Sequence, residues 1–144
     1  MNTDNAHPVT IVMIEDDDGH ARLIERNIRR AGVTNEIVPL TNGHAALEFL
    51  LGEDGSGTVN SRRALLVLLD LNLPDMSGVD ILQKIKTNTH LKRTPVVVLT
   101  TTDDEREIQR CYDLASRWTM LRVDKRAAPS FRKTITTPSR STTT

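Results

Sequence analysis

The sequence predicts an α/β fold, a doubly wound parallel sheet with helices on both faces. Short apolar, β-branched runs alternate along the chain with segments whose apolar residues recur at helical spacing. Strands that alternate with helices in this way are joined by right-handed crossovers and pair in parallel. The 144 residues are enough for one domain with a core of its own.

Four apolar segments are predicted as strands. Residues 65–69 are apolar at every position, which is typical of a central strand that is covered on both faces. Residues 9–14 and 95–99 are also rich in β-branched residues, and residues 36–40 form a weaker candidate.

A predicted helix follows each strand. Gly32 and Gly52 are expected to end the first two helices, and Gly78 precedes the third. The capping-box spacing of Thr102 and Glu105 predicts the start of the fourth. The apolar faces are, in chain order, Ala21, Ile24, Ile28 and Ala31; Ala46, Phe49 and Leu50; Ile81, Leu82 and Ile85; and Ile108, Cys111, Tyr112 and Ala115.

The composition argues against several classes of partner. The formal net charge is zero, so no general basic field favours nucleic acid, and no apolar run approaches the ~20 residues of a membrane span. The start of the chain lacks the pattern of a signal peptide, and the single cysteine fits a reduced cytoplasm. The four histidines, His7, His20, His44 and His90, show no metal-binding spacing and are interpreted as surface residues.

Polar side chains follow three of the predicted strands, at the edge of the sheet where doubly wound folds bind their ligands. The first strand is followed by four acids at residues 15–18, the third by Asp70, and the fourth by threonines at residues 100–102. If the first and third strands are neighbours, Glu15, Asp16 and Asp70 lie in one small volume and repel one another unless a cation is bound. A hard divalent cation with oxygen ligands meets this need, and Mg²⁺ is the usual ion in phosphate chemistry.

A simpler interpretation exists for the first group of acids. Residues 16–18 could be solvated acids at the start of a helix, where the helix dipole favours negative charge. Asp70 is harder to explain in this way, because an acid that closes an apolar strand has no capping role.

Three motifs, in this order, resemble the receiver domains of two-component systems. They are residues 14–17 (Ile-Glu-Asp-Asp), residues 68–78, which run from Leu-Leu-Asp to Met-Ser-Gly, and residues 97–101 (Val-Val-Leu-Thr-Thr). The resemblance covers residues 8–115 as a receiver core and implies the flavodoxin-like receiver fold. Its detail looks like the stand-alone receivers associated with phytochrome-type histidine kinases.

The resemblance implies a role for each matched residue. Asp70 would be the phosphoacceptor, and its carboxylate must then be reachable from solvent. Asp16 would bind Mg²⁺ directly and Glu15 through water. Asp70 itself and the backbone carbonyl of Asn72 would complete the protein ligands. Metal and positioned donors neutralise charge in phosphoryl transfer, which is the main part of its catalysis.

Four further residues receive expected roles from the same motifs. Thr100 would be the switch hydroxyl that binds a phosphoryl oxygen, and the small Thr101 would leave room for the phosphoryl group. Pro74 fixes φ in the loop after the phosphoacceptor, and Gly78 is expected to adopt a backbone conformation that is costly for other residues.

The resemblance also implies partners and a place in the cell. The expected partner is a sensor histidine kinase of the phytochrome type, in the cytoplasm, and neither a membrane nor nucleic acid is expected. The 29 residues after Ala115 cannot hold an output domain, which argues against DNA binding. Whether the protein forms a homodimer stays open. The chain is expected to be no enzyme beyond its own phosphorylation and slow dephosphorylation.

The last part of the chain departs from the family. Receivers carry a lysine followed by proline after a fifth strand, whereas Arg122 occupies the lysine's position here and no proline follows. Residues 116–144 are basic and rich in Thr, Ser and Arg, with seven Lys or Arg against one acid, so they carry +6 while residues 1–115 carry −6. We expect this tail to be poorly ordered, and we interpret it as the product of an altered reading frame.

This departure leads to a prediction about stability and switching. Without a fifth strand and a fifth helix, the edge of the fourth strand would stay unpaired and the protein would be weakly stable. The planar guanidinium of Arg122 is also not equivalent to a compact lysine ammonium, so phosphorylation or switching is expected to be impaired.

Two alternatives remain beside the phosphoacceptor. A phosphohydrolase with an aspartyl-phosphate intermediate would need a second acid two residues after its nucleophile, where this chain has Asn72. A degenerate receiver that serves only as a binding module is the second alternative, favoured by Arg122 and the unusual tail.

Overall fold

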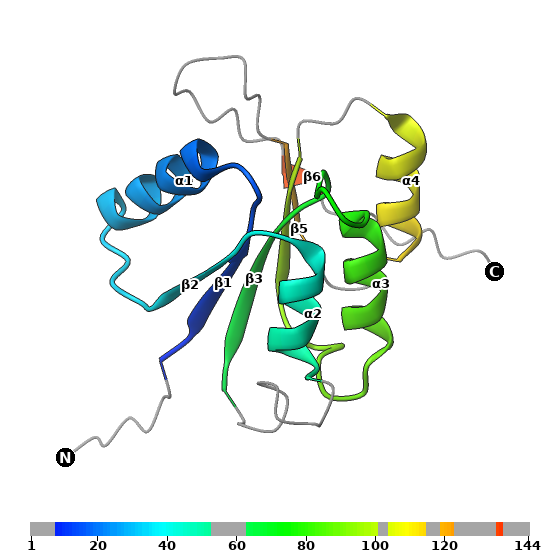
Figure 1. Cartoon of the computed structure of the whole chain (residues 1–144), viewed down its shortest axis with the longest axis horizontal. Helices are drawn as coiled ribbons and strands as arrows, with labels where there is room; N and C mark the ends of the chain where they lie inside the picture. Colours follow the sequence, from blue (N-terminus) through cyan, green and yellow to red (C-terminus); the bar gives the residue numbers. More distant parts are fainter. Residues whose placement is uncertain (1–7, 53–62, 101–103, 115–118, 123–134, 137–144) are drawn as a thin grey trace.

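The computed structural model describes residues 8–52, 63–100, 104–114, 119–122 and 135–136. In them a six-stranded sheet has the order β2-β1-β3-β4-β5-β6 (Figure 1), in which β1 to β5 are parallel and β6 is antiparallel to β5. The elements are β1 (Thr10–Ile14), α1 (Asp18–Arg30), β2 (Ile37–Leu40), α2 (Gly43–Leu50), β3 (Leu65–Asp70), α3 (Gly78–Thr87), β4 (Val96–Thr100), α4 (Glu105–Asp113), β5 (Thr119–Arg122) and β6 (Ile135–Thr136). The predicted doubly wound parallel sheet is confirmed.

The alternation of side chains along the strands divides the core between the two faces of the sheet. Val67 and Leu69 of β3 are completely buried in the larger cluster, to which α2, α3 and α4 contribute. Leu68 lies on the other face, where Ile24 and Ile28 of α1 pack against the sheet. The central strand is therefore covered on both faces, as its uniformly apolar sequence predicts.

The helix ends follow the sequence signals with one exception. Gly32 and Gly52 come just after α1 and α2 and have φ of 84° and 64°, a left-handed conformation that glycine adopts without strain. The predicted capping box of the fourth helix is wrong. The N-cap of α4 is Asp104, whose carboxylate accepts the backbone N–H of Arg106 at 2.9 Å. The helix therefore begins at Glu105, two residues later than a cap at Thr102 would place it. Thr102 lies outside the described residues.

The expectation that the edge of β4 stays unpaired is wrong. β5 pairs with β4 in parallel over four residues, and Thr100 lies opposite Arg122 in the register. An open strand edge offers a row of backbone donors and acceptors. These can pair with an extended segment even when its residues have little intrinsic preference for a strand. The region where a fifth helix would lie, residues 123–134 and 137–144, is outside the described residues.

The reason for a glycine at position 78 also differs from the expectation. Gly78 does not have a positive φ. Instead, a Cβ atom there would lie 2.5 Å from the carbonyl oxygen of Asp70 and 2.6 Å from the Cα of Leu71. The Gly78 N–H donates to the Leu71 carbonyl at 2.9 Å, so α3 begins in direct contact with the backbone at the end of β3. The glycine is needed for this close approach.

Candidate metal centre

The sheet order brings the acids of two strands together. β1 and β3 are neighbours, with Ile14 opposite Leu69, so the residues that follow lie side by side. One carboxylate oxygen from each of Glu15, Asp16 and Asp70 lies within 4.8 Å of the other two. Three carboxylates at this separation fit a hard divalent ion that takes oxygen ligands. The predicted convergence of these acids is confirmed.

The three acids differ in exposure. Glu15 and Asp70 are buried, at 4% and 1% exposed, whereas Asp16 is exposed. The expectation of a solvent-accessible phosphoacceptor is therefore not met in this conformation. The cause is the position of Asp70 at the end of a central strand, between β1 and β4 and beneath the start of α3. The exposed Asp16 marks the side of the site that opens to solvent.

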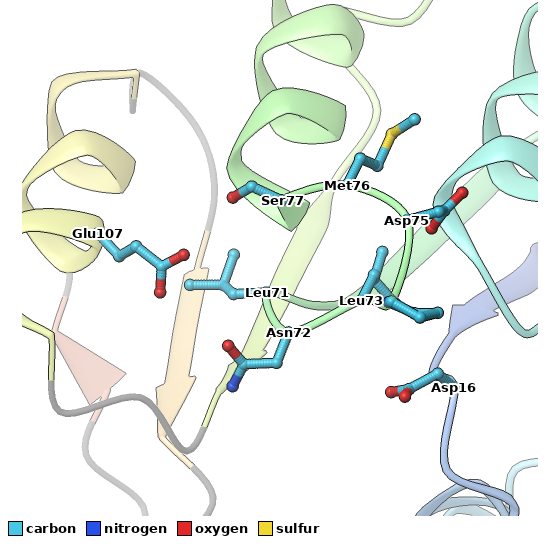
Figure 2. A pocket seen from close by; sticks show the side chains of 9 residues that line it. Asp16, Leu71, Asn72, Leu73, Asp75, Met76, Ser77 and Glu107 are labelled. Atoms are coloured by element: carbon cyan, nitrogen blue, oxygen red, sulfur yellow. The ribbon is translucent and has the colours of Figure 1, made fainter.

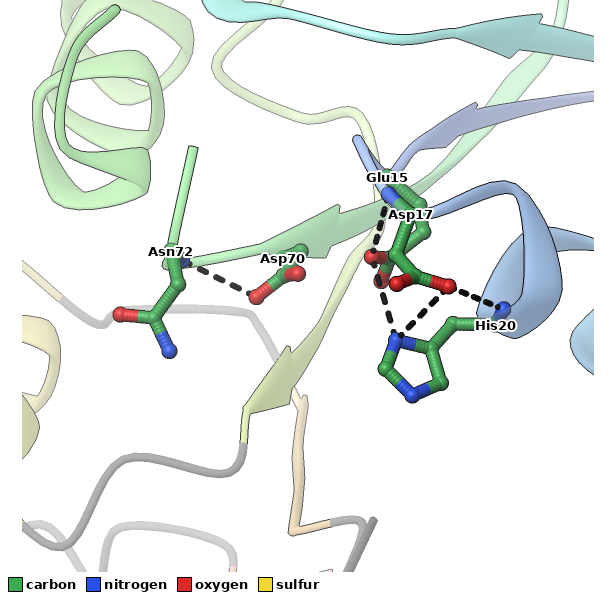
Figure 3. Close-up of polar contacts among 5 residues, drawn as sticks. All are labelled: Glu15, Asp17, His20, Asp70 and Asn72. Carbon is green, nitrogen blue, oxygen red and sulfur yellow. Dashed lines mark hydrogen bonds and ion pairs between the residues drawn. The ribbon is translucent and has the colours of Figure 1, made fainter. Parts of the chain in front are cut away.

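The loop after Asp70 is closed by short-range hydrogen bonds. The backbone N–H of Asn72 donates to Asp70 Oδ1 at 3.0 Å, which fixes one oxygen of the carboxylate (Figure 3). Asn72 and Ser77 form an antiparallel bridge across the loop. The loop therefore holds the Asn72 backbone next to Asp70, where its carbonyl was predicted to serve as a metal ligand.

An open hollow of about 500 Å³ lies beside this loop (Figure 2). Its lining residues are Asp16, Leu71, Asn72, Leu73, Pro74, Asp75, Met76, Ser77 and Glu107. Figure 2 shows Asp16 and Glu107 on opposite sides of the loop. Glu107 was not predicted, because its place depends on the packing of α4 against α3. An ion pair joins these helices, with Arg110 Nη2 at 3.6 Å from Asp80 Oδ1.

Asp75 fastens the same loop to α2. Its two carboxylate oxygens accept the backbone N–H groups of Gly43 and His44, each at 2.8 Å. These hydrogen bonds to the charged form, above all that from Gly43, lower the pKa of Asp75 below its ordinary value. The role of Asp75 was also missed, because its partners are more than 30 residues away in the sequence.

His20 lies at the acid cluster, which corrects its interpretation as a surface residue. Its side chain is 34% exposed, and Nδ1 lies 3.8 Å from Glu15 Oε1 and 3.4 Å from Asp17 Oδ1. Asp17 is the N-cap of α1 and accepts the backbone N–H of His20 at 2.8 Å. The spacing of an N-cap acid and a histidine three residues later is the sequence signal that could have placed it here.

Two of the remaining predicted site residues, Thr100 and Arg122, lie on the other side of Asp70. Thr100 ends β4 and Arg122 ends β5, and their opposition in the register agrees with the position assigned to Arg122 by counting from Thr100. Their side chains and the whole of Thr101 lie outside the described residues. Within the described parts of the chain, no helix is both long and apolar enough to cross a membrane.

Comparison with known proteins agrees with this geometry. The family model of the response regulator receiver domain matches residues 11–120. The response regulator Rcp1 from Synechocystis is 38% identical over 114 residues, which cover 79% of this chain and 76% of Rcp1. The resemblance to the receiver domains of two-component systems is thereby confirmed.

Solved structures of similar proteins extend the comparison. A response regulator receiver domain from Rhodospirillum rubrum is 65% identical, with a TM-score of 0.71, and covers 82% of this chain and 84% of that one. The Mn²⁺-bound form of Rcp1 has a TM-score of 0.67 at 37% identity, with coverage of 77% and 79%. The phosphorylated cyanobacterial phytochrome response regulator RcpA has a TM-score of 0.66 at 37% identity, with coverage of 78% and 79%. This similarity confirms the predicted resemblance to receivers of the phytochrome-associated type. The chain belongs to the response regulator receiver domain family of two-component signalling.

Proposed function

We propose that the protein receives a phosphoryl group on Asp70 from a histidine kinase, in a reaction that depends on Mg²⁺. The observation that carries the proposal is the convergence of Glu15, Asp16 and Asp70 within 4.8 Å. Two similar proteins support it, since Rcp1 has been solved with Mn²⁺ and RcpA in a phosphorylated form. The proposed kinase is of the phytochrome type.

The chemistry follows from the carboxylate of Asp70. One of its oxygens attacks the phosphorus of a phosphohistidine, the P–N bond breaks, and its electron pair returns to the imidazole of the donor. The product is an acyl phosphate on Asp70. A bound divalent ion would neutralise negative charge on the transferring group. Asp16 and Glu15, with the Asn72 carbonyl, are the proposed protein ligands.

The hydrogen bond from the Asn72 N–H has a defined part in this reaction. It holds Asp70 Oδ1 at 3.0 Å from a backbone donor, which orients the carboxylate. Thr100 and Thr101 are proposed to contact and accommodate the phosphoryl group, with Arg122 in the position of the family's lysine.

We also propose that catalysis stops at self-phosphorylation and slow hydrolysis. Enzymes that turn over an aspartyl phosphate rapidly carry a second acid two residues after the nucleophile, and Asn72 occupies this position. An amide cannot act as the general acid or base of such a reaction. A steady-state assay with simple phosphomonoesters is expected to show no turnover.

A degenerate receiver that only binds partners is the second candidate. Two observations favour it: the 1% exposure of Asp70 and the replacement of the family's lysine by Arg122. In this case the carboxylate would stay inaccessible to a phosphodonor, whatever the affinity of the acids for a metal ion.

Intact-mass measurement after incubation with acetyl phosphate and Mg²⁺ separates the two candidates. The wild type is expected to gain the mass of one phosphoryl group, and Asp70→Asn to gain none. Asp113→Asn is the matched control and is expected to behave as the wild type. It removes an exposed carboxylate at the end of α4, which is not a member of the acid cluster. An unmodified wild type would establish the binding module instead.

A further inference from the structure

We infer that His20 is a positioning residue of the divalent-ion site, which acts on the ion through the carboxylate of Glu15. The inference rests on the proposed function, because it concerns the same site. It is carried by the place of the imidazole Nδ1 between the carboxylates of Glu15 and Asp17 (Figure 3).

The start of α1 fixes this placement. Asp17 caps the helix by accepting the backbone N–H of His20 at 2.8 Å, so the backbone of His20 is held in the first turn. Side chains of a helix lean toward its N-terminus, and here this direction leads back to the end of β1. The ring therefore reaches the residues that follow β1 although it belongs to the helix.

The environment of Nδ1 favours a hydrogen-bond donor at this atom. Nδ1 is buried and has no hydrogen-bond partner among the residues that the structure describes. A buried polar atom costs free energy until it is paired. Its neighbours are acceptors, at 3.4 Å on Asp17 and 3.8 Å on Glu15. A movement of about 1 Å would bring Glu15 Oε1 to hydrogen-bond distance.

The carboxylate of Glu15 also has a backbone donor. Its Oε1 accepts the backbone N–H of Asp17 at 3.2 Å, a long hydrogen bond. A further donor on the same oxygen restricts the rotation of the carboxylate. Loss of a partner of this kind, which holds a ligand rather than the metal, typically weakens metal affinity by about 10- to 100-fold.

Direct binding of the ion by His20 fits the geometry less well. The ligand atoms that gather within 4.8 Å belong to Glu15, Asp16 and Asp70, and His20 is not among them. A set of carboxylate oxygens also suits Mg²⁺ and Mn²⁺, whereas an imidazole ligand shifts preference toward Zn²⁺ and Ni²⁺. The two roles therefore predict different patterns of selectivity.

The test is the dissociation constants of Mg²⁺, Mn²⁺ and Ni²⁺, measured by calorimetry on the full chain. His20→Leu removes the donor at similar size, and His20→Asn restores an amide N–H near the position of Nδ1. His90→Asn, at an exposed histidine between α3 and β4, is the matched control. We expect His20→Leu to weaken Mg²⁺ and Mn²⁺ by the same factor, about tenfold, and His20→Asn to recover most of the loss.

Other results would overturn the inference in distinguishable ways. Unchanged Mg²⁺ and Mn²⁺ affinity in His20→Leu, with a folded protein by circular dichroism, would leave His20 without a role at the site. A loss confined to Ni²⁺ would make His20 a direct ligand. If the wild type itself binds Mg²⁺ no better than Asp16→Asn does, the proposed function fails first, and the metal site on which His20 acts is removed.

Discussion

The two sides of Asp70 differ in how closely they follow the family. On the β1 side, Glu15 and Asp16 are present and reach Asp70. On the β4–β5 side, the strands pair as the fold requires, yet Arg122 stands where receivers carry a lysine. The proposed ion site draws on the first side and the proposed switch on the second. Each can therefore be changed without the other, and four predictions test this separation.

The largest expected effect is on stability, from core leucines on the two sides. Leu69 is completely buried beside β1, whereas Leu99 of β4 is 9% exposed on the opposite face. We expect Leu69→Ala to lower the free energy of unfolding by about 2–5 kcal/mol through lost burial and a cavity. Leu99→Ala is expected to cost less. Urea unfolding of both variants measures the difference, and equal or reversed costs would contradict a more firmly packed β1–β3 side.

The second effect is on phosphorylation and comes from the ion ligands. Asp16→Asn removes one charge from the cluster and is expected to slow phosphoryl uptake from acetyl phosphate on the order of 100-fold, the usual loss for a group that stabilises transition-state charge. Asp18→Asn is the matched control, since Asp18 is also an acid at the start of α1 but lies outside the cluster. Rates from intact mass against time decide, and equal slowing in both variants would contradict a specific site.

The third effect concerns the β5 side. Arg122→Lys restores the family's compact ammonium at the end of β5 and is expected to raise the rate of phosphoryl uptake several-fold. The affinity for Mn²⁺ is expected to stay unchanged, because the ion ligands are on the other side. A parallel change in Mn²⁺ affinity would show that the two sides are not separable.

The smallest effect is the pH dependence from Asp75. Its pKa is lowered in the folded protein from 3.8, chiefly by the hydrogen bond from Gly43. A lowered folded pKa adds stability that is present above the unfolded pKa and is lost as the pH falls through the folded pKa. Asp75→Asn is therefore expected to be less stable than the wild type near neutral pH, and the gap is expected to close below pH 3.8. Thermal unfolding across this range measures it, and a constant gap would contradict the prediction.

The sequence allowed the central part of the fold and the acid cluster to be predicted because their signals are local. An apolar run that ends in Asp70, and another that ends in Glu15, predict both the strands and the edge at which the acids meet. β5 was missed because its four residues carry little preference of their own, and pairing with β4 supplies the stability. The reason for Gly78 was misjudged because a close approach of two backbones is visible only after packing.

Two of the three missed members of the site share a physical cause. Asp75 binds N–H groups of α2, and His20 contacts Glu15 across the N-cap of α1. Glu107 lines the hollow from α4. Nothing in the chain around Asp75 distinguishes a helix-capping carboxylate from an exposed loop acid. The places of Asp75 and Glu107 depend on the arrangement of elements in space, which periodicity and spacing do not reveal. For His20, the N-cap spacing from Asp17 was a usable signal.

The double hydrogen bond of Asp75 has a mechanical consequence. The loop after β3 and the first turn of α2 are joined through one carboxylate, so a displacement of the loop strips two helix N–H groups of their acceptor at once. Such a loss is unfavourable for a helix start, and the two segments are expected to travel together. The amide protons of Gly43 and His44 thus become remote reporters of the loop beside Asp70, and their hydrogen exchange can be followed without any label at the site.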